Sequence, residues 1–144
     1  MDIYNYLKKD HKKVNKLMED LLAIEDKEQK HILFEKIKQE LLLHAKTEEK
    51  TFYQEIEDKK PAKEWVEEAK SEHKEIEKYL KKLSALKFGD EEWIEQFGEF
   101  KHSVSHHVEE EEGRIFDKAK QILSSKRADE LSEEMEEMKK TIKI

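Results

Sequence analysis

Two ten-residue stretches of the chain carry the same pattern of histidine and glutamate. The first runs from His44 to Tyr53 and the second from His107 to Phe116, and both read His-x-x-x-Glu-Glu-x-x-apolar-aromatic. On an α-helix, residues four apart are separated by about 40° around the axis and about 6 Å along it. The imidazole and the first carboxylate of each stretch therefore face the same side, where they can bind a cation together.

Acidic residues are so common in this chain that the spacing alone carries little weight. Asp and Glu make up 36 of the 144 residues, and five of the seven histidines have an acid four positions later. The position of each histidine relative to the hydrophobic stripe of its helix separates them better. The residues that continue such stripes are His11, His44, Glu48, His73, His107 and Glu111.

The other three histidines are better explained without a shared site. His102 and His106 lie off the stripe that contains His107, so we expect them to be exposed to solvent. His31 lies about 20 Å along its helix from His44 at the standard rise of an α-helix. We expect His31 to have a structural role at the end of the fold.

The elements that must position these residues are helices. The chain is 45% charged and contains only 3 Gly and 1 Pro, too few for the turns of an all-β protein. Apolar periodicity predicts four long helices. The first runs from about Asp2 to Ile24, the second ends at a break over residues 58–61, the third begins near Pro61, and the fourth begins near Glu91.

Short connections between long helices favour an all-α, up-down-up-down antiparallel four-helix bundle. We expect one domain over residues 1–144, with the bundle over about 2–123 and a short additional C-terminal helix over about 126–142, packed on the bundle. His73 follows His11 by 62 residues and His107 follows His44 by 63. These offsets suggest a duplicated helical hairpin.

In such a bundle the four stripe histidines are expected at similar heights, within one or two helical turns of each other. Four imidazoles and two carboxylates in an apolar interior are costly without compensating charge. We therefore predict two metal ions, with the histidines as terminal ligands and Glu48 and Glu111 as bridges. Nitrogen and oxygen donors without sulfur suit iron or manganese and admit zinc. Glu49 and Glu112, next to the predicted bridges, remain unassigned between a supporting role and simple exposure.

The combined pattern over residues 1–123 resembles the hemerythrin-like, or HHE cation-binding, family. Its elements are His11, His44-x-x-x-Glu48, His73 and His107-x-x-x-Glu111. The resemblance implies a non-haem di-iron centre with an oxo or hydroxo bridge, which binds dioxygen when reduced.

The chain departs from true hemerythrins at two places. They have His-x-x-x-His where this chain has His73-x-x-x-Glu77, so Glu77 is a candidate additional ligand. They also place an aspartate five residues after the last histidine, whereas Glu111 follows His107 by four. The departures favour the HHE branch, whose members are associated with oxygen or iron sensing, nitric oxide, peroxide handling and iron-sulfur repair.

We expect a metal-binding protein that binds dioxygen, or another diatomic ligand such as nitric oxide, for sensing, buffering or iron-linked redox chemistry. Ligand binding is favoured over catalysis. Two alternatives stay open: a di-iron redox enzyme acting on peroxide, oxygen or nitric oxide, and a helical interaction module whose histidines are structural.

Composition narrows the remaining classes. The net charge of −7, with both signs interleaved, does not favour a nucleic acid partner. The absence of cysteine excludes disulfides and thiolate metal sites. No apolar run approaches the length needed to cross a bilayer, so we expect a cytoplasmic protein without membrane contact.

Overall fold

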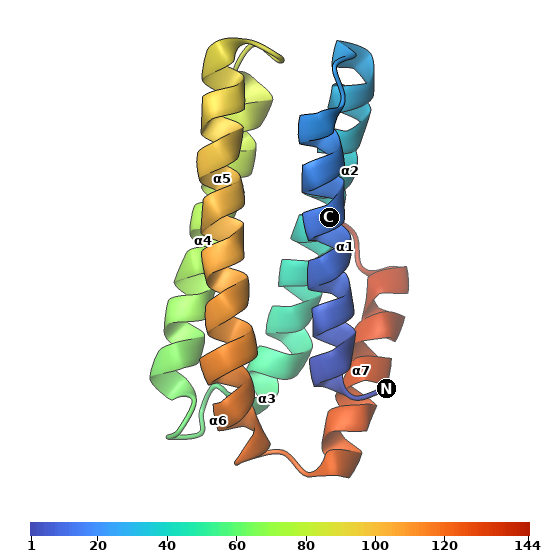
Figure 1. Cartoon of the computed structure of the whole chain (residues 1–144). Helices are drawn as coiled ribbons and strands as arrows, with labels where there is room; N and C mark the ends of the chain where they lie inside the picture. Colours follow the sequence, from blue (N-terminus) through green and yellow to red (C-terminus); the bar gives the residue numbers. More distant parts are fainter.

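Four long helices run antiparallel in the computed structural model, which describes residues 1–144 (Figure 1). They are α1 (Ile3–Ala23), α2 (Lys27–Glu48), α4 (Lys63–Ala85) and α5 (Glu91–Glu110). Two of them are extended by a π-helical turn and a short helix: α2 by η1 (Glu49–Tyr53) and α3 (Gln54–Ile56), and α5 by η2 (Glu111–Ile115) and α6 (Phe116–Lys120). The predicted all-α, up-down-up-down bundle is confirmed.

The helix ends follow the local chemistry of the sequence. Asp2 begins α1 by accepting a hydrogen bond from the backbone N–H of Asn5 at 2.9 Å, and Asp26 begins α2 by accepting from Gln29 at 3.0 Å. The connection before α5 turns at Gly89, whose φ of +83° is readily adopted only by glycine. Each connection is thus encoded by residues at the ends of the helices it joins.

One further helix, α7 (Ser125–Thr141), lies outside the bundle. It packs against α1, α2 and η1, and it occupies the lower right of the molecule in Figure 1. The hydroxyl of Ser132 donates to the backbone oxygen of Met1 at 2.6 Å, and Arg127 binds both oxygens of Glu55 at 2.8 and 2.9 Å. The predicted C-terminal helix is confirmed, with its ends within one residue of the expected positions.

The apolar core is divided into two layers. One contains Tyr4, Phe52 and Phe116, whose rings meet edge to face, and the other is built around Trp93 and Phe97. On every long helix, the residues singled out by the sequence lie between the segments that contribute to these two layers. The polar residues are therefore enclosed above and below by apolar packing.

None of the helices combines the length and the apolar character needed to span a bilayer.

Two glycines give opposite predictions for the stability of the fold. Gly89→Ala places a side chain at positive φ, with its Cβ about 3.0 Å from the Lys27 side chain, and should lower the free energy of unfolding by about 1 kcal/mol. Gly98→Ala, in the interior of α5 with open space around it, should raise it by about 0.5–1 kcal/mol. Urea unfolding of the two variants measures both effects. A Gly89→Ala variant at least as stable as the wild type would contradict the positive φ of the Gly89 turn, and a destabilised Gly98→Ala variant would contradict the open space around Gly98.

Candidate metal centre

Six polar side chains meet at one level of the bundle interior. None is more than 8% exposed, and the two glutamates are completely buried. They come from α1, α2, α4, α5 and η2, and are His11, His44, Glu48, His73, His107 and Glu111. These are the six residues that the hydrophobic stripes of the sequence singled out, so the structure brings the whole predicted set together.

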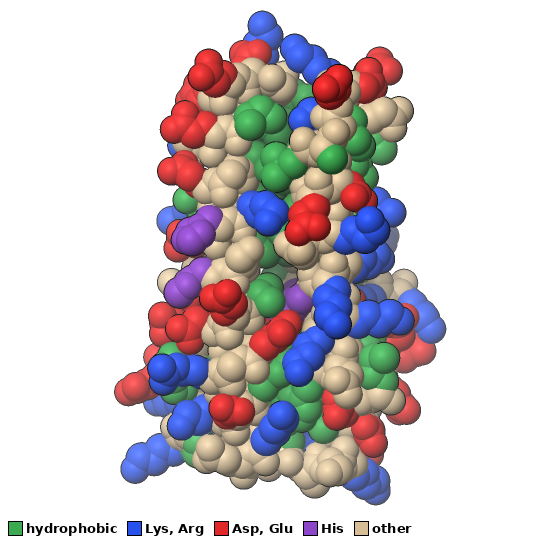
Figure 2. All heavy atoms as spheres, in the orientation of Figure 1, with side chains coloured by type: hydrophobic (Ala, Val, Ile, Leu, Met, Phe, Trp, Pro, Cys, Tyr) green, Lys and Arg blue, Asp and Glu red, His purple; other side chains and the backbone are tan.

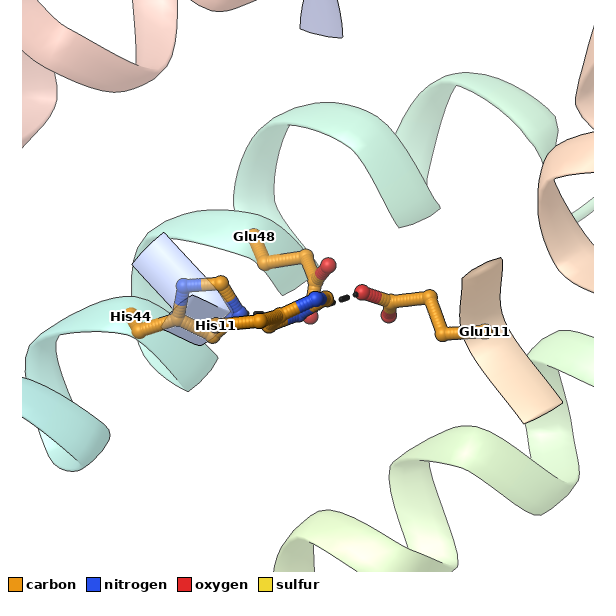
Figure 3. A group of neighbouring side chains, drawn as sticks. All are labelled: His11, His44, Glu48 and Glu111. Atoms are coloured by element: carbon orange, nitrogen blue, oxygen red, sulfur yellow. Dashed lines mark ion pairs between the residues drawn. The ribbon is translucent and has the colours of Figure 1, made fainter. Parts of the chain in front are cut away.

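Their donor atoms form two overlapping groups, and within each group the atoms lie within 4.8 Å of one another. The first group is His11, His44, Glu48 and Glu111, drawn in Figure 3, and the second is Glu48, His73, His107 and Glu111. In the first, Nε2 of His11 lies 3.1 Å from Oε1 of Glu111. In the second, Nε2 of His73 lies 3.3 Å from Oε1 of Glu48. Glu48 and Glu111 each belong to the two groups at once. Ligands that bridge a pair of metal ions would occupy such shared positions.

A second set of carboxylates fixes the orientation of the imidazoles. Each histidine has its Nδ1 against one carboxylate oxygen, in the pairs His11–Glu112 at 2.7 Å, His44–Asp10 at 2.9 Å, His73–Glu49 at 2.7 Å and His107–Glu72 at 2.7 Å. An ionised carboxylate only accepts hydrogen bonds, so each Nδ1–H is the donor. The Nε2 atoms are therefore directed inward, where each can carry a proton or offer its lone pair to a metal ion.

Of these four outer carboxylates, the sequence left Glu49 and Glu112 open between a supporting role and exposure, and the structure gives them the supporting role; Asp10 and Glu72 were not singled out. Asp10 and Glu72 directly precede a clustered histidine, and Glu49 and Glu112 directly follow a clustered glutamate. Each one reaches a histidine on another helix, and spacing within one helix cannot show such a contact. The available signal was the repeat itself, because all four recur at the same offset of 62 or 63 residues as the inner residues.

Tyr53 is a further residue that the sequence did not mark. Its hydroxyl donates to Oε2 of Glu111, and its ring stacks on that of His73 with centroids 5.5 Å apart and planes 17° apart. The position 63 residues later is Phe116, which has no hydroxyl. Tyr53 is therefore a point at which the two halves of the cluster differ.

Charge is out of balance in the cluster without a metal ion. Burial and the adjacent carboxylate of Glu111 raise the pKa of Glu48 well above its ordinary value. Burial favours the neutral form of His11, but Glu111, Glu48 and Glu112 overcome it and raise its pKa to about 9. Protons on these groups neutralise the buried carboxylates, and a bound cation would displace them.

Unpaired atoms provide a test of whether the residues fit a metal. Five buried atoms of the first group form no hydrogen bond: Nε2 of His11 and of His44, both carboxylate oxygens of Glu48, and Oε1 of Glu111. Some of them face each other only as ion pairs, such as Nε2 of His11 and Oε1 of Glu111 at 3.1 Å. Each such atom costs roughly 1–3 kcal/mol when left unsatisfied. A divalent cation between them would satisfy all five, and the mixture of imidazole and carboxylate without sulfur suits iron, manganese or zinc. The residues therefore fit a metal centre.

A cavity of about 420 Å³ adjoins the four histidines. Its remaining wall combines aliphatic residues, among them Val14, Leu41, Ile76, Leu80 and Val104, with the charged residues Asp10, Lys46, Glu49, Lys74 and Glu77. Figure 2 shows apolar side chains and a histidine at mid-height, in a gap between charged side chains. The cavity gives small neutral molecules an apolar space next to the cluster.

The structure leaves the other candidates outside the cluster. The carboxylate of Glu77 is about half exposed and faces Nζ of Lys81 at 3.7 Å, so it is not brought to the donor groups. His31 is exposed and meets the ring of Phe88 edge to face near the end of the bundle, and His106 is exposed at the surface.

Antiparallel helices around buried histidines and shared carboxylates define a four-helix-bundle metal-binding protein. The sequence model of the family called Hemerythrin HHE cation binding domain matches residues 2–119, and the chain belongs to this family. Its fold is also that of the crystal structure of a Hemerythrin HHE cation binding domain-containing protein from Mycobacterium kansasii. The TM-score is 0.87 at 21% identity, over 97% of this chain and 86% of that one.

The chain is also 25% identical, over 142 residues, to a protein from Nostoc sp. named DNA nickase. The match covers 99% of this chain but only 40% of the nickase, so this chain spans about two fifths of the length of that relative.

The pKa of His11 makes the metal-free protein sensitive to pH. Its folded-state pKa of about 9 lies above the unfolded value of about 6.5, so the stability it contributes is complete below pH 6.5 and is lost as the pH rises to 9. With metal chelated, the free energy of unfolding should fall by about 3 kcal/mol across this window. Urea unfolding at both pH values measures the change.

His11→Gln is the control for this measurement, because it removes one titrating group and should reduce the dependence between pH 6.5 and 9, leaving the part of the same sign that comes from the raised pKa of Glu48. A wild-type protein equally stable at both ends of the window would show that His11 is not protonated in the cluster.

Proposed function

We propose that the chain holds two iron ions in the two overlapping donor groups and binds dioxygen, or nitric oxide, when the iron is reduced. The observation that carries this proposal is that both groups contain two histidines and share the same two buried carboxylates. Ligand sets of histidine and carboxylate that leave open coordination positions are typical of iron sites that react with oxygen. Bound iron would supply an open position for a diatomic ligand and electrons for its reduction.

The residues around the cluster support this role. The outer carboxylates hold the imidazoles in one tautomer, so little rearrangement is needed when iron binds. The aliphatic part of the cavity wall gives a neutral diatomic molecule an apolar place next to the site. We infer sensing or buffering of such a ligand as the biological role.

Iron content and absorption spectra test this function. Protein loaded with ferrous iron under anaerobic conditions should contain about two ions per chain and develop near-ultraviolet bands on exposure to oxygen. His107→Ala removes a donor of one group only and should lower the iron content to about one ion. His102→Ala, an exposed residue on the same helix, is the matched control and should retain both ions. Wild-type protein that takes up no iron would contradict the proposal.

One observation favours a second function, a redox enzyme acting on peroxide. The hydroxyl of Tyr53 is buried against Glu111, at the shared carboxylates of the cluster. Burial, followed by the charges of Glu111 and Glu48, raises its pKa well above the ordinary value, so it stays protonated at neutral pH. A buried, protonated phenol at this position can donate a hydrogen bond to a ligand bound beside it and so stabilise charge that develops on that ligand.

Tyr53→Phe separates the two functions, since phenylalanine already occupies the corresponding position 116. If the iron-loaded protein consumes peroxide in the steady state, the variant should lose at least about tenfold in turnover while keeping its iron content. Uptake of ligand without sustained consumption would reject the enzymatic function and leave the binding function standing.

DNA cleavage has no support from the residues of this chain. Its formal net charge is −7, and Figure 2 shows acidic and basic side chains interspersed over the visible face. Binding to the phosphate backbone of DNA depends on concentrated positive charge. We infer a small diatomic molecule as the ligand, without a nucleic acid partner.

A further inference from the structure

The outer carboxylates of the cluster differ in their contact with fixed positive charge. Asp10, which accepts from His44, also lies 2.5 Å from Nζ of Lys139 on α7. No other lysine or arginine lies within 4 Å of any of the four outer carboxylates. The counterpart of Asp10 in the second half, Glu72, has only His106 at 3.9 Å in addition to its bond with His107.

The contact between Lys139 and Asp10 is well enclosed. Their side chains are only 15% and 19% exposed, and Nζ of Lys139 also lies over the ring of Tyr6, 4.7 Å from its centroid. The hydroxyl of Tyr6 donates to Glu136 on α7 at 2.5 Å. Asp10 and Tyr6 of α1 thus contact Lys139 and Glu136 of α7, and these contacts together hold Lys139 at the carboxylate of Asp10.

We propose that Lys139 is a positioning residue, which holds Asp10 and through it the imidazole of His44. Docking of α7 and occupation of the metal position formed by His11 and His44 are then thermodynamically linked. The proposal rests on metal binding by the cluster and goes beyond it, because it assigns a role to a helix that contributes no donor atom.

The sign of the linkage follows from the chain of contacts. A cation on Nε2 of His44 fixes the ring, and the fixed Nδ1–H holds the carboxylate of Asp10 in one orientation. The same carboxylate oxygen of Asp10 contacts both His44 and Lys139, so a metal ion that holds His44 in place also holds this oxygen against Lys139, and metal binding tightens the docking of α7. By reciprocity, docked α7 raises the affinity of this position for metal by the same factor. The position formed by His73 and His107 lacks the lysine and is not linked.

The helix itself does not depend on this contact. Ala128, Leu131 and Met135 of α7 are buried in the core layer formed with Tyr4 and Phe52. Lys139→Met keeps the aliphatic length of the side chain and removes only its charge. The variant is therefore expected to fold with α7 still present, which makes the linkage testable in the complete chain.

The experiment follows α7 while metal is added. Metal-free protein is titrated with Co(II) alone, its visible absorption spectrum reports each occupied position, and amide hydrogen exchange is measured over residues 125–141. In the wild type, loading should slow exchange at the C-terminal end of α7 by about tenfold. In Lys139→Met the slowing should be lost, and one of two Co(II) ions should bind 10–100-fold more weakly with a changed spectrum.

Two further variants separate positioning from a merely structural effect. Lys139→Arg keeps the charge and should restore both the response of α7 and the spectrum. Lys140→Met removes a neighbouring lysine that contacts only the exposed Glu137, at 3.2 Å, and should behave as the wild type. Equal slowing of exchange in Lys139→Met and wild type, or no slowing in a wild type that binds Co(II), would overturn the linkage alone. A wild type that binds no Co(II) would overturn the metal function as well.

Discussion

Burial of two carboxylates in one layer of the bundle is the constraint on which the rest of the structure depends. Glu48 and Glu111 are completely buried and belong to the same two donor groups, so their charges repel in a medium that screens them weakly. Isolated charges at such a place would cost far more than one domain can spare. Inward Nε2 atoms, protons or a cation must compensate them, and the outer carboxylates hold the imidazoles ready to do so. Apolar layers lie on either side of this polar layer along the bundle axis.

The π-helical turns reconcile this polar layer with the packing below it. In an α-helix, two consecutive residues differ by about 100° in direction, so they seldom both face the core. After the glutamates, however, Phe52 and Tyr53 are both buried, and so are Ile115 and Phe116. The extra residue in η1 and η2 shifts the phase of each helix, and Tyr53 thereby reaches Glu111 while Phe52 packs in the core. Such turns are often found at functional sites.

The fold and the inner site were predictable because both depend on periodicity within single helices. His44 and Glu48 continue one stripe, and the structure places both in the interior. Glu77 shows the limit of spacing as a criterion. It follows His73 by four residues, but the buried stripe of α4 continues after three, through Ile76 and Leu80, so Glu77 turns toward solvent.

Contacts between helices could not be predicted in this way. Asp10, Glu72 and Lys139 act on residues that lie far from them in sequence, and their spacing shows no periodicity that links them to their partners. The phase shift that brings Tyr53 to the cluster is equally hidden, because an ideal helix would direct that side chain elsewhere. The sequence shows only a repeat: the acidic neighbours of the inner histidines and glutamates recur at the same offset as those residues.

Because the two halves of the cluster repeat the same donors, the residues that differ between the halves are chemically important. A duplicated hairpin places equivalent donors around two positions, and exact equivalence would give two metal ions of equal affinity and potential. Tyr53 has a hydroxyl where Phe116 has none, and it stacks on His73 in one half of the cluster. Lys139 adds a positive charge to the carboxylate behind His44 in the other half. Since outer contacts tune both the basicity of a ligand and the potential of its metal, two ions bound in these groups would be unequal although the donor atoms match. An unequal pair can differ in the order in which its ions bind and are oxidised, and a symmetric pair cannot.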